Sequence, residues 1–469
     1  MKLIYGIKDR PKFGQVIVFA IQQLLAIMAA TLVVPVIINT SGSMPPFAPQ
    51  MSSAAALFGA GIGTLVYLLF TRFKSPVFLG SSFAFIGSMC SAFAGAISAQ
   101  AGYLGLIIGA VCAGLVYVVI ALIVKFAGVK WISKLMPAVV IGPTVAIIGL
   151  SLAGNAIGDL QTAPAGGSSY VAILCGLVTL AVTMLCATFG KKMIRLIPFI
   201  MGILAGYALA AIFTLIGNAA GIDALKVINF APLTNLFTDF SIKSIVSVPD
   251  FTFVEALKGI KDIDAAYIGT VAVAYAPVAF VVFAEHIADH KNLSSIIEKD
   301  LLEDPGLHNT LLGDGVGSMA GAFFGGCPNT TYGESVGCVA ITGNASVLTV
   351  LTTAIMAIVI SFLSPFVAFV NTIPSCVMGG VCMALYGFIA VSGLKMIQKV
   401  DLEQNRNLFV VSVILITGIG GLSVSFGKVT LTTIACALIL GILANVMLGV
   451  KDKKPAEEAP ASEDNTYEL

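Results

Sequence analysis

Long apolar runs separated by short polar loops dominate this chain. A helix of about 20 apolar residues spans the hydrocarbon core of a bilayer, which is about 30 Å thick. Of the 469 residues, 58% are hydrophobic and only 10% are charged, whereas a soluble domain carries about 25% charged residues. A water-soluble fold could not cover its surface with so few charges. The sequence therefore predicts an all-α polytopic membrane protein with about fourteen transmembrane segments, at residues 14–37, 53–71, 76–97, 103–127, 134–152, 170–189, 195–217, 264–289, 310–326, 328–345, 347–370, 374–394, 406–424 and 428–448.

The charges of the loops indicate how the chain crosses the membrane. If the N-terminus is cytoplasmic, twenty of the 25 Lys and Arg residues fall in inside loops, as the positive-inside rule requires. We therefore expect a multi-pass protein of the cell (inner or plasma) membrane with both termini in the cytoplasm. Residues 1–13 would form the N-terminus, 218–263 an extracellular or periplasmic connection, and 450–469 a disordered polar tail.

Two weak internal similarities indicate a repeat of seven segments. The stretch Pro137–Gly142 (PAVVIG) recurs as Pro374–Gly379 (PSCVMG), each opening the fifth segment of its set. The third segment of each set carries a small, polar interruption, FLGSSFAF at 78–85 and CPNTTYGES at 327–335. Because seven is odd, the second copy must cross the membrane in the opposite direction. Inverted repeats with broken helices at matching positions are typical of secondary transporters that bind substrate near the bilayer midplane.

The two interruptions matter because a broken helix leaves backbone N–H and C=O groups without partners, each costing several kcal/mol in hydrocarbon. A break is therefore expected only where protein or a polar ligand satisfies these groups. Each interruption is followed by a new helix start, whose free N–H groups attract carbonyl oxygens or anions. Alternatively, Gly and Ser only permit close helix packing here; two interruptions at equivalent positions favour a site.

Three acidic residues are the first candidates for that site, because burying a charge in a membrane costs at least about 2.5 kcal/mol. Glu334 lies in an apolar run without Lys or Arg, so a structural ion pair is the weaker interpretation. Glu285 closes the apolar run of the eighth segment, and Asp289 follows one helical turn later on the same face. Hydropathy leaves the depth of Glu285 open, and Asp289 could be solvated at the helix end.

Other polar residues are weaker candidates for the predicted site. His286 and His290 form an i, i+4 pair on the neighbouring face of the same helix and are expected at the membrane interface. Together with Glu285 and Asp289 they do not have the HExxH spacing of a zinc enzyme. Asp314 either lines the pathway or caps the ninth helix. The nine cysteines lie in apolar stretches without metal-binding spacing and are expected to be small buried hydrophobes.

The chemistry of such a site favours a proton-coupled carrier. Two carboxylates without basic partners would be costly if both stayed ionised in a dry site, so at least one is expected to take up a proton near neutral pH. Carboxylates also accept hydrogen bonds from N–H groups of a neutral ligand, and free backbone N–H groups donate to its carbonyl oxygens. A small planar molecule with both groups is favoured. No nucleophile–base pair, metal set or basic patch indicates an enzyme, a cofactor or a nucleic-acid partner.

At these residues the sequence resembles the nucleobase–ascorbate transporter family (nucleobase:cation symporter type 2), and within it the bacterial uracil permeases. The stretches that carry the resemblance are FLGSSFAF (78–85), FAEHI (283–287), KDLLEDPGLH (299–308), FGGCPNTTYGES (324–335) and VMGGVCMALYG (377–387). It implies a 7+7 inverted repeat with short strands in spans 3 and 10. It also implies a homodimer whose protomers each have a core domain (14–127 and 264–370) and a gate domain (128–217 and 374–448).

The resemblance also assigns roles to single residues. Glu285 and Glu334 would bind the base through their side chains. Phe83 and Gly333 would contribute backbone N–H groups, with Phe83 also packing on the ring, and Tyr386 would lie near the substrate. Proton coupling would involve Glu285 and two further positions, Asp289 and Gln23.

Three departures from the family pattern qualify these assignments. Ser335 stands where the family signature has Asn, and the change is expected to weaken a supporting hydrogen bond. Asp289 stands where uracil permeases often carry His, and Gln23 where a His is known, so the coupling residue is expected to differ. Glu334 replaces the Gln that is typical of xanthine and urate carriers, which favours uracil.

The sequence thus predicts a secondary active transporter that imports uracil or a close nucleobase by proton symport, with alternating access of the core against the gate. A xanthine or purine symporter is the serious rival. An anion transporter of the same fold is less favoured, because two carboxylates would repel an anion. An intramembrane enzyme or a structural scaffold is less favoured still, since a scaffold has no need of buried acids at helix breaks.

Overall fold

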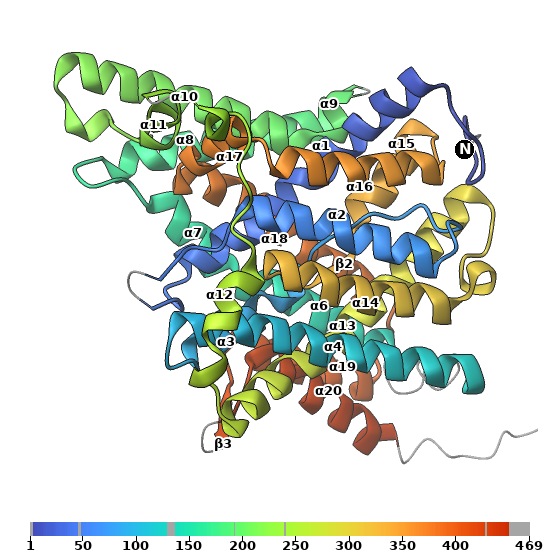
Figure 1. The fold of residues 1–469 in the computed structure, drawn as a ribbon. Helices are drawn as coiled ribbons and strands as arrows, with labels where there is room; N and C mark the ends of the chain where they lie inside the picture. Colours follow the sequence, from blue (N-terminus) through green and yellow to red (C-terminus); the bar gives the residue numbers. More distant parts are fainter. Residues whose placement is uncertain are drawn as a thin grey trace, which may run out of the picture.

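The fold of the chain is known from a computed structural model that describes residues 3–45, 48–128, 137–191, 193–238, 241–426 and 429–449. The predicted tail at 450–469 and the start of the predicted fifth segment lie outside the described residues. So do several of the loop cations that were used to orient the chain, namely Lys2, Lys130, Lys134, Lys192 and Lys428. The chain is mostly helical (Figure 1).

The first half of the chain contains long apolar helices and one short strand. Its elements are α1 (Phe13–Thr40), α2 (Ser53–Phe70), β1 (Leu79–Ser81), η1 (Phe83–Phe85), α3 (Ile86–Ala94), α4 (Ala99–Ala127), α6 (Ala138–Ser151), α7 (Ala153–Gln161), α8 (Ser169–Phe189), α9 (Met193–Leu196) and α10 (Pro198–Ala220). Short helices follow within the expected connection 218–263, among them α11 (Ala231–Thr238) and α12 (Thr252–Lys258).

The second half has a similar order of elements. They are α13 (Ala265–Ile297), η5 (Leu302–Gly306), α14 (Leu307–Gly325), β2 (Asn329–Thr331), α15 (Gly333–Thr342), α16 (Val347–Ser361), α17 (Ser364–Thr372), α18 (Ser375–Ile397), α19 (Asn405–Ile419), β3 (Val424–Phe426), β4 (Val429–Leu431) and α20 (Thr433–Gly449). The strands β1 and β2 lie within the two polar interruptions of the sequence, 78–85 and 327–335.

Among the described residues, eight helices are long and apolar enough to cross a membrane: Phe13–Thr40, Ser53–Phe70, Ala99–Ala127, Ala138–Gln161, Ser169–Phe189, Pro198–Ala220, Ala265–Ile297 and Ser375–Ile397. Four shorter apolar helices accompany them, at Phe83–Ala94, Val347–Ser361, Asn405–Ile419 and Thr433–Gly449. The chain is therefore a multi-pass membrane protein. The total of about fourteen spans stays a prediction.

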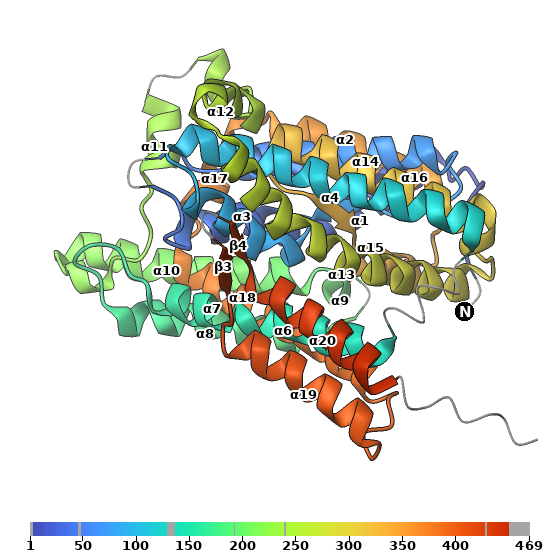
Figure 2. The ribbon, with the colours of Figure 1, turned by 90° about the horizontal axis from the view of Figure 1, so that it is seen from below.

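The helices form two packed groups, which Figure 2 shows one above the other. In the first group α2 packs against α14 and α16, and α4 packs against α13 and α14. In the second group α18 packs against α6 and α8, and α19 packs against α6 and α20. The assignment of a core domain and a gate domain to these residues stays a prediction.

Glycines bring the helix backbones of each group into close contact. A Cβ atom at Gly63 of α2 would lie 2.7 Å from the backbone oxygen of Gly317 in α14. In the second group, a Cβ at Gly393 of α18 would lie 2.5 Å from the backbone oxygen of Gly142 in α6. Small residues permit this approach, and dispersion contacts along the helices then stabilise it. Both groups are consequently tightly packed bodies.

Corresponding elements of the two halves lie next to each other. The second helices of the two sets, α2 and α14, pack together, and so do the fifth, α6 and α18. The broken third segments meet as well, because β1 pairs with β2. Each helix group therefore contains elements from both halves of the chain.

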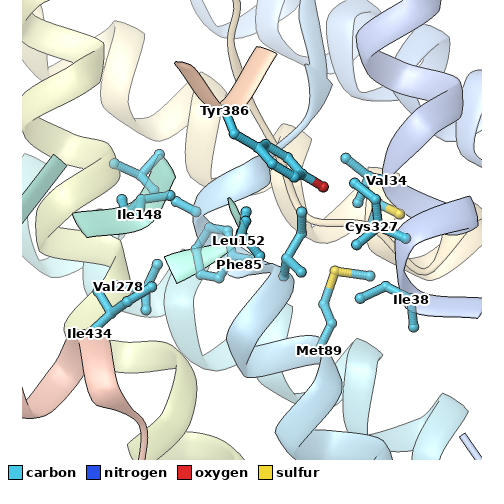
Figure 3. Packing of buried hydrophobic residues seen from close by; sticks show 14 of the residues in the cluster. Val34, Ile38, Phe85, Met89, Ile148, Leu152, Val278, Cys327, Tyr386 and Ile434 are labelled. Atoms are coloured by element: carbon cyan, nitrogen blue, oxygen red, sulfur yellow. The ribbon is translucent and has the colours of Figure 1, made fainter. Parts of the chain in front are cut away.

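An apolar layer joins the two groups beside the strand pair (Figure 3). The first group contributes Val34, Ile38, Phe85, Met89, Val278 and Cys327, and the second contributes Ile148, Leu152, Tyr386 and Ile434. We call these ten residues the apolar layer. Every one of them is buried, so the two groups are in dry contact here.

Candidate functional site

The candidate site is built around the antiparallel pairing of β1 and β2. Gly80 lies opposite Thr330, flanked by the pairs Leu79 with Thr331 and Ser81 with Asn329. Each three-residue strand is followed within two residues by a new helical segment, η1 after β1 and α15 after β2. The two polar interruptions of the sequence therefore meet and bring two helix starts to one place.

Neighbouring side chains satisfy the backbone groups that the short strands leave unpaired. The Leu79 N–H donates to the Thr64 hydroxyl of α2 at 2.9 Å, and the Phe78 N–H donates to Ser335 Oγ at 3.1 Å. The Tyr332 hydroxyl donates to the Ser81 carbonyl at 2.7 Å. Because unpaired backbone groups are costly in hydrocarbon, these bonds are what permits non-helical chain at this position.

A cavity of about 430 Å³ lies between the strand pair and the second helix group. The wall that belongs to the first group carries most of the polar atoms, from Ser82, Glu285, Asp289, Thr330 and Glu334, together with Phe83 and Gly333. The opposite wall is mainly apolar and is formed by Ile141, Val145, Ile148, Phe199, Leu385, Phe388, Ile389, Ser392 and Met396. The volume is typical of a site for a small molecule.

Five of the predicted site residues line this one cavity. Glu285 and Asp289 reach it from one face of α13, as their i, i+4 spacing indicated. Glu334 lies in the first turn of α15 and Gly333 begins that helix. Phe83 begins η1. As first residues of helical segments, Phe83 and Gly333 have N–H groups that their own helices cannot pair.

The remaining two predicted residues lie beside the cavity rather than in its wall. Tyr386 is buried in α18, and its ring contacts the Phe83 ring edge-on, with centroids 6.2 Å apart. Gln23 is buried in α1 and its amide nitrogen donates to Ser335 Oγ at 2.8 Å. Tyr386 is therefore adjacent to the site, and Gln23 acts on it through Ser335.

The acids of the cavity have no basic partner in the described part of the chain. No Lys or Arg there forms an ion pair with Glu285, Asp289 or Glu334. Asp289 Oδ2 accepts a hydrogen bond from the Thr331 hydroxyl of β2 at 2.9 Å. Sequence reasoning missed this link, because it depends on how β2 lies against α13.

Ser335, one of the departures from the family pattern, makes more contacts than expected. Its hydroxyl oxygen accepts from both the Gln23 amide and the Phe78 N–H. One side chain thus joins α1, the start of β1 and the first turn of α15. That the replacement of Asn weakens a supporting hydrogen bond stays a prediction.

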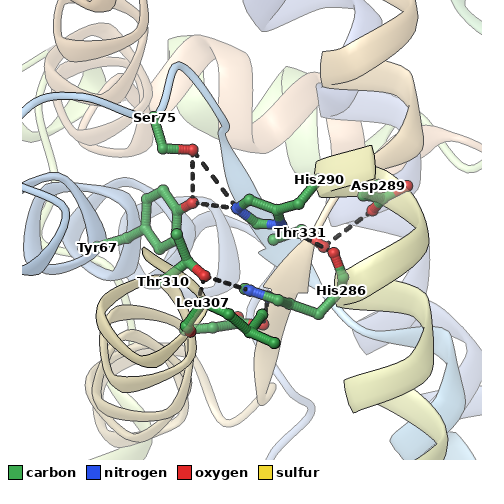
Figure 4. Close-up of polar contacts among 9 residues, drawn as sticks. Tyr67, Ser75, His286, Asp289, His290, Leu307, Thr310 and Thr331 are labelled. Atoms are coloured by element: carbon green, nitrogen blue, oxygen red, sulfur yellow. Dashed lines mark hydrogen bonds and ion pairs between the residues drawn. The ribbon is translucent and has the colours of Figure 1, made fainter. Parts of the chain in front are cut away.

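Both His286 and His290 are fully buried within the protein, and their expected position at the membrane interface stays a prediction. They point away from the cavity towards α14 and α2 (Figure 4). His286 Nδ1 lies 2.7 Å from Asp314 Oδ2. Asp314 lies in the interior of α14, so it neither lines the cavity nor caps the helix. The sequence signal for this contact was the second i, i+4 pair on α13.

The sequence of the chain is similar to the sequences of known permeases. The family model described as "Permease family" matches residues 14–426. The chain is 37% identical to the uracil permease of Bacillus caldolyticus over 95% of each chain. It is also 34% identical to the uracil permease of Escherichia coli (strain K12), over 98% of this chain and 97% of that one.

Solved structures with low sequence identity share the fold. The transmembrane domain of the cyanobacterial bicarbonate transporter BicA superposes with a TM-score of 0.59 at 16% identity, covering 94% of this chain and all of that one. The murine Slc26a9 anion transporter in the inward-facing state superposes with a TM-score of 0.61 at 12% identity, over 95% of this chain and 69% of that one. At such identities the likeness concerns the fold alone.

Proposed function

Since the chain belongs to the permease family of nucleobase–ascorbate transporters, we propose that it imports uracil by proton symport. The family membership makes it a nucleobase transporter and not an enzyme. Uracil as the substrate, the proton as the coupled ion and alternating access as the mechanism are the parts of the proposal that require testing.

The observation that carries the proposal is the chemistry of the polar wall. Two carboxylates, Glu285 and Glu334, share one cavity with the helix starts at Phe83 and Gly333, and no Lys or Arg of the described chain pairs with either acid. Carboxylates accept hydrogen bonds and backbone N–H groups donate them. A uracil ring offers the complementary set, two N–H donors and two carbonyl acceptors.

In the proposed complex the base lies between the two strand–helix units. Its N–H groups donate to Glu285 and Glu334, and its carbonyl oxygens accept from the N–H groups of Phe83 and Gly333. The Phe83 ring packs on the base, and Tyr386 lies behind Phe83 on the gate side. Each of these hydrogen bonds then has one partner from the protein and one from the ligand, so that the N–H and C=O groups of the base are paired.

Asp289 is the proposed proton carrier together with Glu285. Its carboxylate lines the cavity one turn from Glu285 and is hydrogen-bonded to Thr331 of β2. Gln23 has no titratable group, so its contribution to coupling is to position Ser335 beside Glu334. A proton on Asp289 would reduce the repulsion among the three acids when the base binds.

Alternating access is proposed to move the first helix group, as the core, against the second, as the gate. The pairing of α2 with α14, of β1 with β2 and of α6 with α18 supports a 7+7 inverted repeat of about fourteen spans. The cavity extends to Ile141 near the start of α6 and to Met396 near the end of α18. Both ends are cytoplasmic in the predicted topology, so this conformation is open inwards.

We also expect a particular oligomeric state and consider one alternative class of substrate. A homodimer follows from the family resemblance and is checked by the molar mass of the detergent-solubilised protein.

Xanthine or another purine is the second candidate substrate, because a cavity of about 430 Å³ has room for a second ring. Competition by a panel of unlabelled bases separates the two.

The test is uptake of radiolabelled uracil by proteoliposomes under an imposed pH gradient. Glu334→Gln keeps the size of the side chain but removes a carboxylate oxygen that accepts from the base, so uptake is expected to be lost while the dimer stays folded. Glu255→Gln, which changes an acid paired with Lys258 outside the cavity, is the matched control and should transport normally. Undiminished uptake by Glu334→Gln would refute the proposed binding mode.

A further inference from the structure

A polar cluster lies inside the first helix group, on the side of α13 that faces away from the cavity (Figure 4). His286 and His290 of α13 meet Thr310 and Asp314 of α14 and Tyr67 of α2. All five side chains are at most 1% exposed. Buried polar groups are costly unless they are paired, and the proposed transport mechanism makes no use of these.

The contacts of His286 restrict where its protons can be. Nδ1 lies 2.7 Å from Asp314 Oδ2, and Nε2 lies 3.0 Å from Thr310 Oγ1. The Thr310 hydroxyl also lies 3.0 Å from the Leu307 carbonyl oxygen, which can only accept. When Thr310 donates to that carbonyl, its oxygen accepts from an N–H at Nε2. One further proton is then shared between Nδ1 and Asp314, and the pair is neutral.

The same contacts also accommodate one proton fewer. If the Thr310 hydroxyl rotates to donate to Nε2, the imidazole keeps its proton at Nδ1 and donates it to an ionised Asp314. The pair then carries one negative charge. A hydroxyl can donate or accept, so both ring nitrogens of His286 remain hydrogen-bonded in either state. The site changes its proton count through one hydroxyl rotation, without a movement of the helices.

We propose that His286 and Asp314, with Thr310, form a proton-binding site of the core that is separate from the nucleobase cavity. Its ligand is a single proton. The site gains and loses this proton whether or not a base is bound, and its charge acts on Glu285, the next residue along α13. This inference does not depend on which substrate the cavity takes.

His290 provides an internal comparison. Its Nδ1 lies 2.8 Å from the His286 carbonyl oxygen, so Nδ1 must carry a hydrogen. Its Nε2 lies 2.7 Å from the Tyr67 hydroxyl oxygen, and the Tyr67 hydroxyl donates to Ser75 Oγ at 2.8 Å. No carboxylate contacts the ring among the described residues. Because no carboxylate stabilises an imidazolium at this position, we expect His290 to stay neutral, with its proton at Nδ1, while His286 exchanges its proton.

The surroundings leave the charge of the pair without local compensation. The groups that face His286 are the stacked His290 ring, with centroids 4.0 Å apart, and the Tyr117 ring of α4, at 6.5 Å. Within the described chain no Lys or Arg pairs with Asp314. In surroundings of low dielectric constant, the charge is felt by Glu285 and Asp289 on the neighbouring face of α13.

The chain offers a direct measurement because it has only three histidines. Protein labelled with 15N-histidine, in lipid nanodiscs and without any nucleobase, gives three imidazoles, assigned with His290→Gln and His308→Gln. Between about pH 5 and pH 8, where histidine ordinarily titrates, the His286 nitrogens are expected to pass from two protonated positions to one. The His290 nitrogens should keep one tautomer throughout.

Two variants connect that titration to the cluster. Asp314→Asn is expected to abolish the doubly protonated state of His286, because the imidazolium loses its carboxylate. Thr310→Val, which removes the hydroxyl at nearly constant volume, should change the His286 titration, whereas Thr179→Val in α8, another buried threonine bonded within its own helix, should not. Unchanged His290 signals show that each variant is folded.

The proposal is overturned if His286 keeps a single tautomer across this range, or if it still titrates in Asp314→Asn. Because these spectra need no substrate, either result leaves uracil transport untouched. Conversely, failure of the uptake assay would not affect this proton site.

Discussion

Glu285 and Glu334 reach the same cavity from backbones of different kinds. Glu285 lies within a continuous helix of 33 residues, whereas Glu334 lies in the first turn of a helix that begins beside a strand. The position of Glu285 therefore depends on how α13 packs. The position of Glu334 depends on the small contacts that hold the start of α15, and Ser335 makes two of them.

Ser335→Ala should weaken binding of the base. It leaves the Gln23 amide and the Phe78 N–H without their acceptor, and each unsatisfied buried group costs about 1–3 kcal/mol. We expect a lower melting temperature and a loss of uracil affinity of tenfold or more by calorimetry. Ser91→Ala, which removes a hydroxyl bonded only within its own helix, is the control. Unchanged affinity in Ser335→Ala would show that the serine does not hold the site.

Asp289→Asn should separate substrate binding from proton coupling. Asn keeps an oxygen that accepts from Thr331, so the link between α13 and β2 survives, but it cannot carry a proton. Uracil counterflow without a gradient is expected to persist, and accumulation driven by a pH gradient is expected to be lost. Asp304→Asn, at the exposed ion pair with Lys74, should retain both activities. If Asp289→Asn still accumulates uracil under a pH gradient, a residue other than Asp289 carries the coupled proton.

At the scale of single residues, one part of the candidate site could be predicted from the sequence and another part could not. Glu285, Glu334, Phe83 and Gly333 could be placed in one cavity from charge, broken helices and resemblance. The burial of His286 could not be predicted from the sequence, because hydropathy ended the eighth segment at 289, whereas α13 continues to Ile297. At 1.5 Å per residue this helix is about 50 Å long, and the histidines lie well before its end.

At the scale of elements, the sequence predicted that helices break at the positions of β1 and β2. It did not predict the register in which these two strands pair. Gly, Ser, Thr and Pro in matching positions indicated broken helices, since such residues favour neither a long helix nor lipid contact. The pairing of Gly80 with Thr330 depends on tertiary packing, in which the Tyr332 ring lies against Gly80 and the Asn329 side chain against Gly63 and Gly321, and no local sequence pattern reveals it. Hydropathy likewise gave 347–370 as one segment, whereas the helix breaks before Pro365 into α16 and α17.

Gly80→Ala tests the packing of the strand pair. An added Cβ would collide with the Tyr332 ring, and overpacking of this kind costs about 1–3 kcal/mol. We expect a lower melting temperature and lost uracil binding, because the collision displaces the start of α15. Gly87→Ala, in the neighbouring α3, places its Cβ where no atom lies within 4 Å and should behave like the parent protein. Normal binding by Gly80→Ala would mean that the strands tolerate displacement.

At the scale of the whole molecule, the cavity and the apolar layer adjoin each other between the two helix groups, and Ile148 belongs to both. The side chains of the layer are all buried, and the cavity extends towards the predicted cytoplasmic ends of α6 and α18. Glycine contacts make each helix group tight internally. Movement is therefore expected between the groups rather than within them.

Thiol labelling tests the direction in which the cavity opens. In a variant without reactive native cysteines, Ser392→Cys places a thiol at an exposed position of the cavity wall. A membrane-impermeant maleimide should label it from the cytoplasmic side only, and saturating uracil should slow the reaction. Ile38→Cys, in the buried apolar layer, should stay unlabelled. Labelling of Ser392→Cys from outside alone would reverse the proposed orientation.

The antiparallel seam between β1 and β2 has a consequence for how the protein is assembled. The strand β1 is synthesised early and β2 only after about two thirds of the chain. A truncated product that stops before Asn329 therefore lacks one strand of the pair that borders the candidate cavity. We therefore expect the candidate cavity to form late in synthesis, when β2 pairs with β1.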